Sequence, residues 1–455
     1  MSPATDGTRW IFAFYLLLVV WVPIPLGSNR SWSWAVLEIW VFILSLAWVA
    51  GRVRGKFSAG PVIRSARPVL ACACAWLAYV WLQLLPLPLE VLKLLSPEAA
   101  RWHVAAAVPG TTVTAPLTLD RYSTLDSACK STAYMAFFFL GMILLRDRDR
   151  VRMATYALIF SGIFQALYGA IASFQVAGGV AAGTFVNRNH YAAYLVMCLS
   201  VGVGVLVASL SNERAVSWGQ FLRGMIQWVI TPKMGLRILL LTMVIALVLT
   251  RSRMGNSSFF IALLVAGAIG LVFSQRAARS TILLLSSLIL IDLFVIGAYF
   301  GAEKVVERIE QTGSRTEDRD EVAGYALEMW KDYPIFGSGL GSFPAVFPRY
   351  SAQGTVAAYT HAHNDYLEFA AETGLVGIAL LGLMVLMSFG AALRAQQVRN
   401  DPVMRGISLA AIMGIVALMI HSSVDFNLQI PANALTFLLL LALAWVSLYC
   451  PGPEA

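Results

Sequence analysis

Charged residues are scarce in this chain of 455 residues. Asp, Glu, Lys and Arg together make up 13% of it, whereas an ordinary soluble domain carries roughly 25%. Apolar residues make up 58%, and the mean hydropathy is +0.72. A single soluble core cannot bury so much apolar surface, so the composition excludes an ordinary soluble protein. It predicts an all-α polytopic membrane protein.

Cysteine and histidine are also scarce, with five residues of each. The Cys72-Ala-Cys74 pair has no matching second pair, and the His-Ala-His sequence at residues 361–363 has no third ligand at metal spacing. We therefore expect no metal and no cofactor. The net charge of +8 is spread over short loops between apolar runs. That distribution indicates membrane topology and not a nucleic-acid interface.

Long apolar runs are abundant, and a spanning helix needs about 20 apolar residues. Twelve candidate spans begin near Trp10, Trp34, Pro68, Ala128, Val151, Arg188, Leu236, Met254, Thr281, Thr373, Ile407 and Ala432. Nine of them lie within residues 1–302, which include an outer loop at about 86–127. A long polar loop at 303–372 follows, and residues 373–455 hold the last three. The first run lacks a small-residue cleavage site, so we expect a retained helix and not a signal peptide.

Basic residues separate the two sides of this arrangement. Most Lys and Arg residues of the short loops fall on the side of the N-terminus, which the positive-inside rule assigns to the cytoplasm. Both termini are then cytoplasmic, and the 303–372 loop is periplasmic. All five histidines fall on the outer side in this prediction, namely His103, His190, His361, His363 and His421. Polar chemistry is therefore expected at one membrane face.

The two outer loops carry local signals of their own. Residues 89–107 are expected to form a short amphipathic helix, and residues 303–331 a charged helical stretch. The sequence Gly337-Ser-Gly-Leu-Gly341 has no βαβ unit around it. We therefore interpret its glycines as a closely packed turn and not as a dinucleotide loop.

Polar residues on the outer side form three main clusters and a weaker fourth one. Arginine binds phosphate oxygens bidentately, a helix N-terminus favours anions, and histidine can act as a general base on a sugar hydroxyl. Together these residue types predict group transfer from a polyprenyl pyrophosphate. The clusters are Asn187, Arg188 and His190; Arg251 and Arg253; His361, His363, Asn364 and Asp365 with Glu368 and Glu372; and His421 with Asp425.

Each cluster also admits an ordinary structural interpretation. An outer arginine can anchor lipid headgroups, and His190 can cap or pack against a helix. The role of His421 and Asp425 can be limited to a hydrogen bond with each other at a helix end. Asp292, deep in the predicted ninth span, can be a structurally paired residue or part of a proton relay.

Four motifs resemble those of the O-antigen ligase family and occur in the same order. They are Gly183-Thr-Phe-Val-Asn-Arg-Asn-His-Tyr-Ala-Ala-Tyr-Leu195, Thr250-Arg-Ser-Arg-Met-Gly255, Tyr333-Pro-Ile-Phe-Gly-Ser-Gly-Leu-Gly-Ser-Phe343, and the stretch from His361-Ala-His-Asn-Asp-Tyr-Leu-Glu368 to Gly377. The resemblance implies a C-type glycosyltransferase-like membrane fold in the bacterial inner membrane. It also implies inverting, metal-independent transfer from undecaprenyl-pyrophosphate glycan to lipid A-core on the periplasmic side.

The resemblance also implies roles for individual residues. His363 is the catalytic candidate, and Arg188 and Arg253 hold the pyrophosphate together with Arg251. Met254 follows Ser-Arg where glycine is common in the family, which leaves open whether Arg251 or Arg253 makes the contact. The supporting residues are Asn187, His190, His361, Asn364, Asp365 and Asp425.

Three other functions fit parts of the sequence. The same motifs occur in O-antigen and exopolysaccharide polymerases, and a protein O-oligosaccharyltransferase is a further alternative. A lipid or sugar transporter usually places coupling charges near the membrane midplane. Here the candidate charges gather at one face, so the transporter is the weakest of these predictions.

Overall fold

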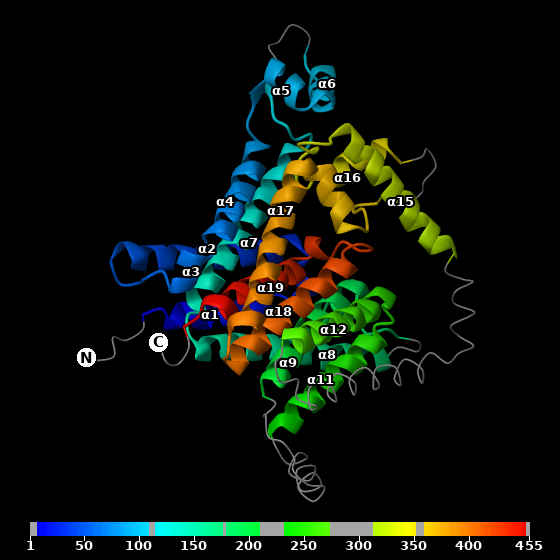
Figure 1. Cartoon of the computed structure of the whole chain (residues 1–455). Coiled ribbons are helices and arrows are strands. Elements are labelled where there is room, and N and C mark those ends of the chain that lie inside the picture. Colours follow the sequence, from blue (N-terminus) through cyan, green and yellow to red (C-terminus); the bar gives the residue numbers. More distant parts are fainter. Residues whose placement is uncertain are drawn as a thin grey trace, which may run out of the picture.

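Helices account for almost all of the secondary structure. The computed structural model describes residues 7–108, 114–175, 179–209, 232–273, 313–351 and 359–451. Within these ranges, eight helices are long and apolar enough to cross a membrane (Figure 1). They are α2 (Ser31–Val53), α7 (Arg121–Leu144), α8 (Arg148–Phe174), α9 (Arg188–Ala208), α12 (Arg253–Phe273), α17 (Asp365–Val398), α18 (Pro402–His421) and α19 (Pro431–Tyr449). The prediction of an all-α polytopic membrane protein is confirmed.

Shorter apolar helices complete the bundle. They are α1 (Arg9–Trp21), α4 (Arg67–Leu82) and α11 (Pro232–Leu249), and a five-residue helix, α3 (Pro61–Ser65), precedes α4. Together with the eight longer helices, the three apolar ones correspond in position to eleven of the predicted spans. The span predicted near Thr281, including Asp292, lies outside the described residues. The count of twelve therefore stays a prediction.

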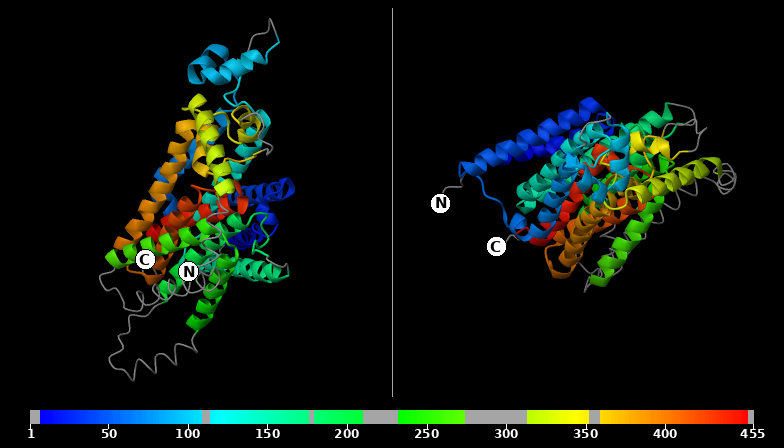
Figure 2. Two further views of the ribbon diagram at one scale, coloured as in Figure 1. Left: turned by 90° about the vertical axis from the view of Figure 1, so that its right-hand side faces the viewer. Right: turned by 90° about the horizontal axis from the view of Figure 1, so that it is seen from above.

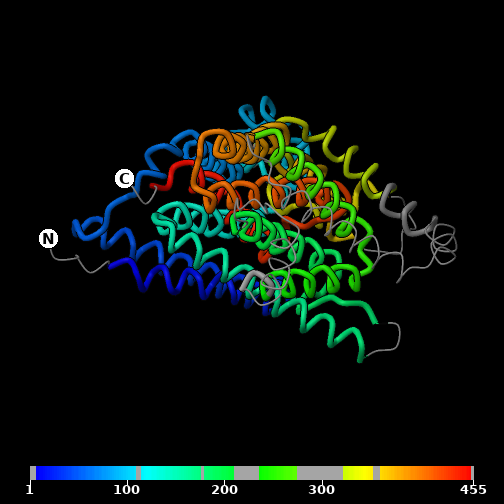
Figure 3. Tube along the Cα trace, turned by 60° about the horizontal axis from the view of Figure 1, so that its bottom comes forward, coloured from blue at the N-terminus to red at the C-terminus, as the bar shows by residue number. Residues whose placement is uncertain are grey.

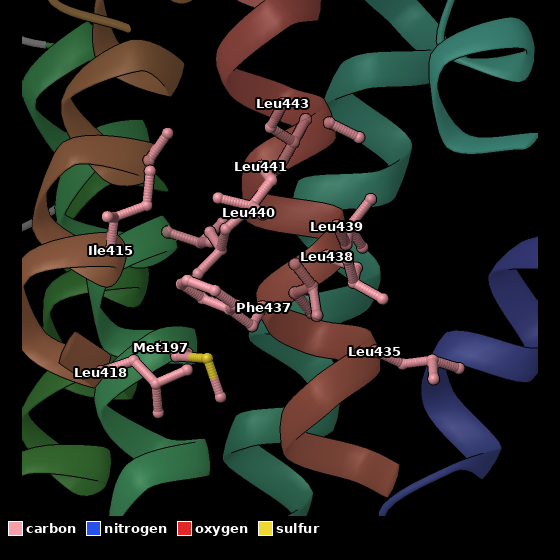
Figure 4. Packing of buried hydrophobic residues seen from close by; sticks show 14 of the residues in the cluster. Met197, Ile415, Leu418, Leu435, Phe437, Leu438, Leu439, Leu440, Leu441 and Leu443 are labelled. Atoms are coloured by element: carbon pink, nitrogen blue, oxygen red, sulfur yellow. The ribbon is translucent and has the colours of Figure 1, made fainter. Parts of the chain in front are cut away.

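The centre of the bundle is α19, which is buried along nearly its whole length. Figure 4 shows its leucines and Phe437 beside Met197 of α9 and Leu418 of α18. α9 and α18 approach each other where glycine removes the side chain, because a Cβ at Gly204 would collide with the carbonyl oxygen of Gly406. Small residues allow such close helix packing in membranes, where burial against lipid gives little driving force.

α1 and α2 form one edge of the bundle (Figures 2 and 3). Their outward side chains are large and apolar, and Trp32 is 60% exposed and Leu46 68% exposed. Lipid can cover these side chains in a membrane, so their exposure fits a spanning helix at the rim. The predicted site residues lie elsewhere, at one end of the bundle.

Small elements extend beyond that end (Figure 1). They are β1 (Leu87–Pro88), β2 (Thr114–Ala115), α5 (Leu89–Leu95), α6 (Pro97–Ala105), α15 (Gly313–Asp332), α16 (Phe343–Val346) and η2 (Phe347–Arg349). β1 and β2 pair antiparallel. The single helix predicted over 89–107 is in fact two, because Pro97 cannot continue α5 and instead begins α6. Of the predicted charged helix at 303–331, residues 313–331 lie in α15 and residues 303–312 lie outside the described residues.

The predicted glycine turn is tightly packed. Gly337, Gly339 and Gly341 have φ values of 68°, 114° and 82°, which favour glycine. A Cβ on Gly337 would collide with the backbone of Glu372, and one on Gly339 would collide with Thr118. The turn therefore presses against the start of α17, as a close-packing role requires.

α17 begins about two turns earlier than predicted, at Asp365 and not near Thr373. The reason is a cap, because the Asn364 side chain accepts from the first backbone N–H groups of the helix. The helix is interrupted at Gly374, where φ is 59° and ψ is −165°, a conformation almost restricted to glycine. The end of the predicted loop is therefore a capped helical segment with its own direction.

At the other end of the bundle, loops predicted to be cytoplasmic meet one another. Arg148 pairs with Asp401 at 3.5 Å, and Arg150 donates to the Thr8 hydroxyl at 3.0 Å. Arg399 donates to the carbonyl of Cys450 at 2.6 Å. These contacts join the ends of five helices that the topology prediction placed on one side.

Candidate active site

The start of α9 carries Arg188 and His190 on its first turn. The Asn187 side chain accepts from the N–H of Asn189 at 2.8 Å and caps the helix. Arg188 is exposed, whereas His190 is buried and its carbonyl accepts from the Asn433 amide of α19 at 3.0 Å. The first turn of α9 is thus fixed from two sides while Arg188 extends outward.

The start of α17 is fixed to the turn that follows α18. The Asn364 side chain accepts from the N–H groups of Tyr366 and Leu367 at 3.0 and 3.2 Å. The N–H of Asp365 donates to the carbonyls of Ser422 and Asp425 at 3.0 and 3.2 Å. Asp365 is buried, and its carboxylate accepts from a backbone N–H at 3.1 Å. Asn364 and Asp365 therefore position the site.

Asp425 joins two of the predicted histidines. Its Oδ1 lies 3.4 Å from His190 Nε2 and 3.6 Å from His363 Nδ1. Burial alone would raise the pKa of Asp425, but the imidazoles of His190 and His363, with a contribution from His421, hold this pKa well below its usual range. His421 thus acts on Asp425 together with the other two histidines. The carboxylate is anionic and lies among three imidazoles.

A second histidine–carboxylate pair lies beside the first. Nδ1 of His361 is 2.8 Å from Oε1 of Glu368, whose other oxygen accepts from the N–H of Ala362 at 2.8 Å. Glu368 is buried, while the His361 side chain is 29% exposed. This is the shortest of the three histidine–carboxylate contacts, so Glu368 orients the His361 ring. The sequence placed Glu368 near the motif but did not predict this pairing.

Phe426 is a site residue that the sequence did not reveal. The ring of His361 stacks on it at 4.2 Å between centroids, with an interplanar angle of 16°. His190 and His363 meet the same ring edge-on at 4.5 and 4.9 Å. One aromatic side chain therefore spaces three imidazoles. The only sequence signal for it is its position next to Asp425.

The predicted arginines lie at neighbouring helix ends. α12 begins at Arg253, and the Ser252 hydroxyl caps it by accepting from the N–H of Gly255 at 3.2 Å. A Cβ on Gly255 would lie 2.7 Å from that of Ala192. Ala192 is one turn after Arg188, so the first turns of α9 and α12 pack side by side. Arg188 and Arg253 thus extend from two adjacent helix N-termini.

Two of the predicted site residues adopt left-handed backbone conformations. The φ angles of Arg251 and His363 are 52° and 51°. Such angles are uncommon for residues other than glycine and often occur at functional sites. Arg251 is partly buried and Arg253 is exposed, so the two arginines of the motif differ in environment.

Sequence comparison assigns a family to part of the chain. No curated protein matches it. Residues 238–382 match the family model described as O-antigen ligase. The chain contains an O-antigen ligase domain. Proteins of this family are glycosyltransferase-like enzymes that act as ligases or polymerases on lipid-linked glycans.

The O-antigen ligase domain holds only part of the candidate site. Arg251, Arg253, His361 and His363 lie inside the matched residues. Three further residues lie outside them, namely Arg188 and His190 on α9 and Asp425 in the turn after α18. The site therefore forms where the O-antigen ligase domain packs against α9 and the turn between α18 and α19.

Several helix N-termini, two of them within the O-antigen ligase domain, lie in this region. α9 and α17 begin here, α12 begins beside α9, and α19 begins just after the turn that holds Asp425. Each N-terminus carries partial positive charge, so it favours an anion. Among the described residues, no group of three or more His, Cys, Asp or Glu side chains is arranged to hold a metal ion. The chemistry available here is that of arginines, helix N-termini and histidine–carboxylate pairs.

Proposed function

We propose that this protein is an O-antigen ligase that transfers glycan from undecaprenyl pyrophosphate to lipid A-core at the periplasmic face of the bacterial inner membrane. The observation that carries the proposal is one juxtaposition. Arg188, on an N-terminus packed beside that of α12, lies two residues from His190, which shares Asp425 with His363. An anion site and a candidate base therefore adjoin each other next to the O-antigen ligase domain.

In the proposed reaction, the acceptor hydroxyl attacks the anomeric carbon of the lipid-linked glycan. The new glycosidic bond forms as the bond from that carbon to the pyrophosphate oxygen breaks, which inverts the configuration. His363 takes the hydroxyl proton, and Asp425, whose Oδ1 is 3.6 Å from Nδ1 of His363, orients its ring. Arg188 and Arg253, together with the helix N-termini, stabilise the charge of the departing undecaprenyl pyrophosphate.

His363 is the better of the two candidate bases. Its ring meets Phe426 edge-on and its backbone is left-handed, whereas His361 stacks on Phe426 and is fixed by Glu368. A stacked and hydrogen-bonded ring suits substrate positioning. We therefore assign His361 a supporting role.

A polymerase is the second candidate, because the family contains both kinds of enzyme. It differs in the acceptor alone, which is then the end of a growing lipid-linked glycan. A transporter is less well supported, since the histidine–carboxylate pairs of the candidate site lie at one end of the bundle and not at its middle.

The test is transfer with purified protein, undecaprenyl-pyrophosphate glycan and lipid A-core in the presence of a chelator. We expect glycan on lipid A-core with wild-type protein and its loss with His363→Ala and Arg253→Ala. Elongation of the lipid-linked glycan without transfer to lipid A-core establishes the polymerase instead. Full transfer by a normally inserted His363→Ala protein refutes the assigned base.

Matched controls come from the same side of the protein. His103 and Arg101 lie on α6, where Nε2 of His103 is 3.2 Å from the carbonyl of Thr118 and Arg101 pairs with Glu98. Neither belongs to the site. His103→Ala and Arg101→Ala should therefore keep transfer within about twofold of wild type, which is the range of ordinary surface substitutions.

A further inference from the structure

The two imidazoles on Asp425 differ in their surroundings. The side chains of His190 and Asp425 are 4% and 1% exposed, whereas that of His363 is 22% exposed. Both histidines lie within 4 Å of the same Asp425 oxygen, Oδ1. One of them is therefore enclosed with the carboxylate, and the other is partly exposed at the surface. This difference in exposure indicates different roles for the two histidines. The inference rests on the proposed function, in which His363 is the base.

We propose that His190 is a positioning residue that holds a positive charge against Asp425, so that His363 is left free to gain and lose its proton. A buried carboxylate is costly without a counter-charge. Of the two imidazoles that approach Oδ1, His190 is the nearer and the more enclosed. His421 is also buried and contributes to the low pKa of Asp425. Because His190 then neutralises Asp425, the attraction of the carboxylate for a proton on His363 is largely cancelled.

The charges around this pair support the assignment. His421 and Asp425 come from α18 and the turn after it, and Asp365, Glu368 and His361 from the segment that enters α17. Asp425 and Glu368 are the buried carboxylates of this set that contact histidines, and an anionic carboxylate favours protonation of an enclosed imidazole.

Two features of α9 act in the opposite direction. Arg188 is on the same turn, and the helix N-terminus contributes partial positive charge. That partial charge is about half a unit, whereas Asp425 carries a full charge at 3.4 Å. Arg188 is exposed, so solvent screens its charge more than that of the enclosed carboxylate. The contact with Asp425 is therefore the stronger influence on His190.

The proposal predicts how His363 responds when His190 loses its charge. The repulsion between the charges of His190 and His363 is then lost, and the His363 imidazolium holds its proton more tightly. For charges roughly 7 Å apart in an effective dielectric of about 20, the midpoint of His363 titration rises by about 1 to 2 pH units. If His190 is instead neutral in the wild type, its replacement by a neutral hydrogen-bond donor has no such effect.

The experiment follows the pH dependence of diethyl pyrocarbonate modification at His363, located by peptide mass spectrometry in detergent-purified full-length protein. Only the unprotonated imidazole reacts, so the rate reports the titration of His363 without any need for transferase activity. The peptide that contains His103 is the internal reference. A lack of glycan transfer by wild-type protein then counts against the proposed function and leaves this test intact.

Two variants distinguish a charged His190 from a neutral one. His190→Gln keeps an N–H donor near the position of Nε2 and removes the charge, so we expect the His363 midpoint to rise by about 1 to 2 pH units. Asp425→Asn removes the carboxylate and the reason for His190 to stay charged, so we expect a shift of less than about half a unit. The His103 midpoint should stay unchanged in both.

The reverse pattern overturns the proposal. If His190 is neutral, His190→Gln leaves the midpoint of His363 in place, and Asp425→Asn lowers it by about 1 to 2 pH units. Should His190→Gln fail to fold, the Asp425→Asn protein alone separates the two cases. Where transfer is active, the acidic limb of the kcat/KM profile should move with the chemical midpoint in each variant.

Discussion

The two ends of the helix bundle use carboxylates in different ways. At one end Asp401 pairs with Arg148, and Asp147 lies 3.7 Å from Arg150. At the other end the partners of Asp425 and Glu368 are histidines. An arginine keeps its charge at every working pH, whereas a histidine changes charge near neutrality. The first end can therefore only hold its shape, while the second can also move a proton.

Catalysis should separate the two ends most strongly. We expect His363→Ala to lower kcat/KM for glycan transfer by about 10²- to 10⁴-fold, because a general base contributes that much. Arg148→Ala at the opposite end should leave kcat/KM within about threefold once the amount of folded protein is matched. Equal losses in both variants would show that the two ends do not differ in function.

A smaller effect is expected at the anion site. Arg253→Lys keeps the charge but loses the bidentate geometry, so kcat/KM should fall about 10-fold, and Arg253→Ala should lower it about 100-fold. Steady-state kinetics over a range of lipid-linked glycan concentrations provides the measurement. Arg251→Lys measured alongside decides which arginine of the motif contacts the pyrophosphate. An effect confined to Arg251 assigns that role to it and not to Arg253.

Stability should respond at the arginine end. The Arg150 side chain is 6% exposed and donates to Thr8 Oγ1 at 3.0 Å and to the Leu144 carbonyl at 3.1 Å. Arg150→Met should lower the free energy of unfolding by about 1.5 to 3 kcal/mol, since hydrogen bonds to a buried charged group are lost. Thermal unfolding in detergent measures this. The loss should be the same from pH 5 to pH 8, because arginine does not titrate there.

The histidine end should instead show a pH-dependent stability of modest size. The pKa of Asp425 is lower in the folded protein than in the unfolded chain, so its ionised form favours folding. This stabilisation is complete above the unfolded value of about 3.9 and is lost as the pH falls through the lower folded pKa. Asp425→Asn should therefore unfold at a lower temperature than wild type at pH 7. If that difference does not shrink below about pH 4, the ionised carboxylate is not its source.

Much of the fold follows from local sequence, because lipid-spanning helices consist of continuous apolar runs. Eleven such runs coincide with helices, and the glycine turn was predicted from its residues alone. The start of α17 was missed because the polar residues from Asp365 to Glu372 look like a loop. The cap at Asn364 and the contacts of the turn after α18 outweigh that polarity.

The candidate site was predicted as residues but not as an arrangement. The residue types and their positions in the sequence identified His363, His190 and Asp425 separately. Their meeting at one carboxylate oxygen depends on how α9, α17 and α18 pack, which no local pattern encodes. Phe426 carries no chemistry of its own, so nothing in the sequence marked it. Such a residue becomes visible only when three imidazoles surround it.

Because α17 is interrupted at Gly374, residues 334–343 and 365–373 depend on each other and should be exchanged only together. Across the break, the N–H of Leu375 donates to the Pro334 carbonyl at 2.8 Å, and the N–H of Gly339 donates to the Glu372 carbonyl at 2.9 Å. Residues of the glycine turn and of the segment just before it thus provide backbone hydrogen-bond partners that a continuous helix would supply from its own backbone. Chimaeras that exchange the histidine-bearing segment between related enzymes must carry the glycine turn with it, and natural recombinants should preserve the same pair.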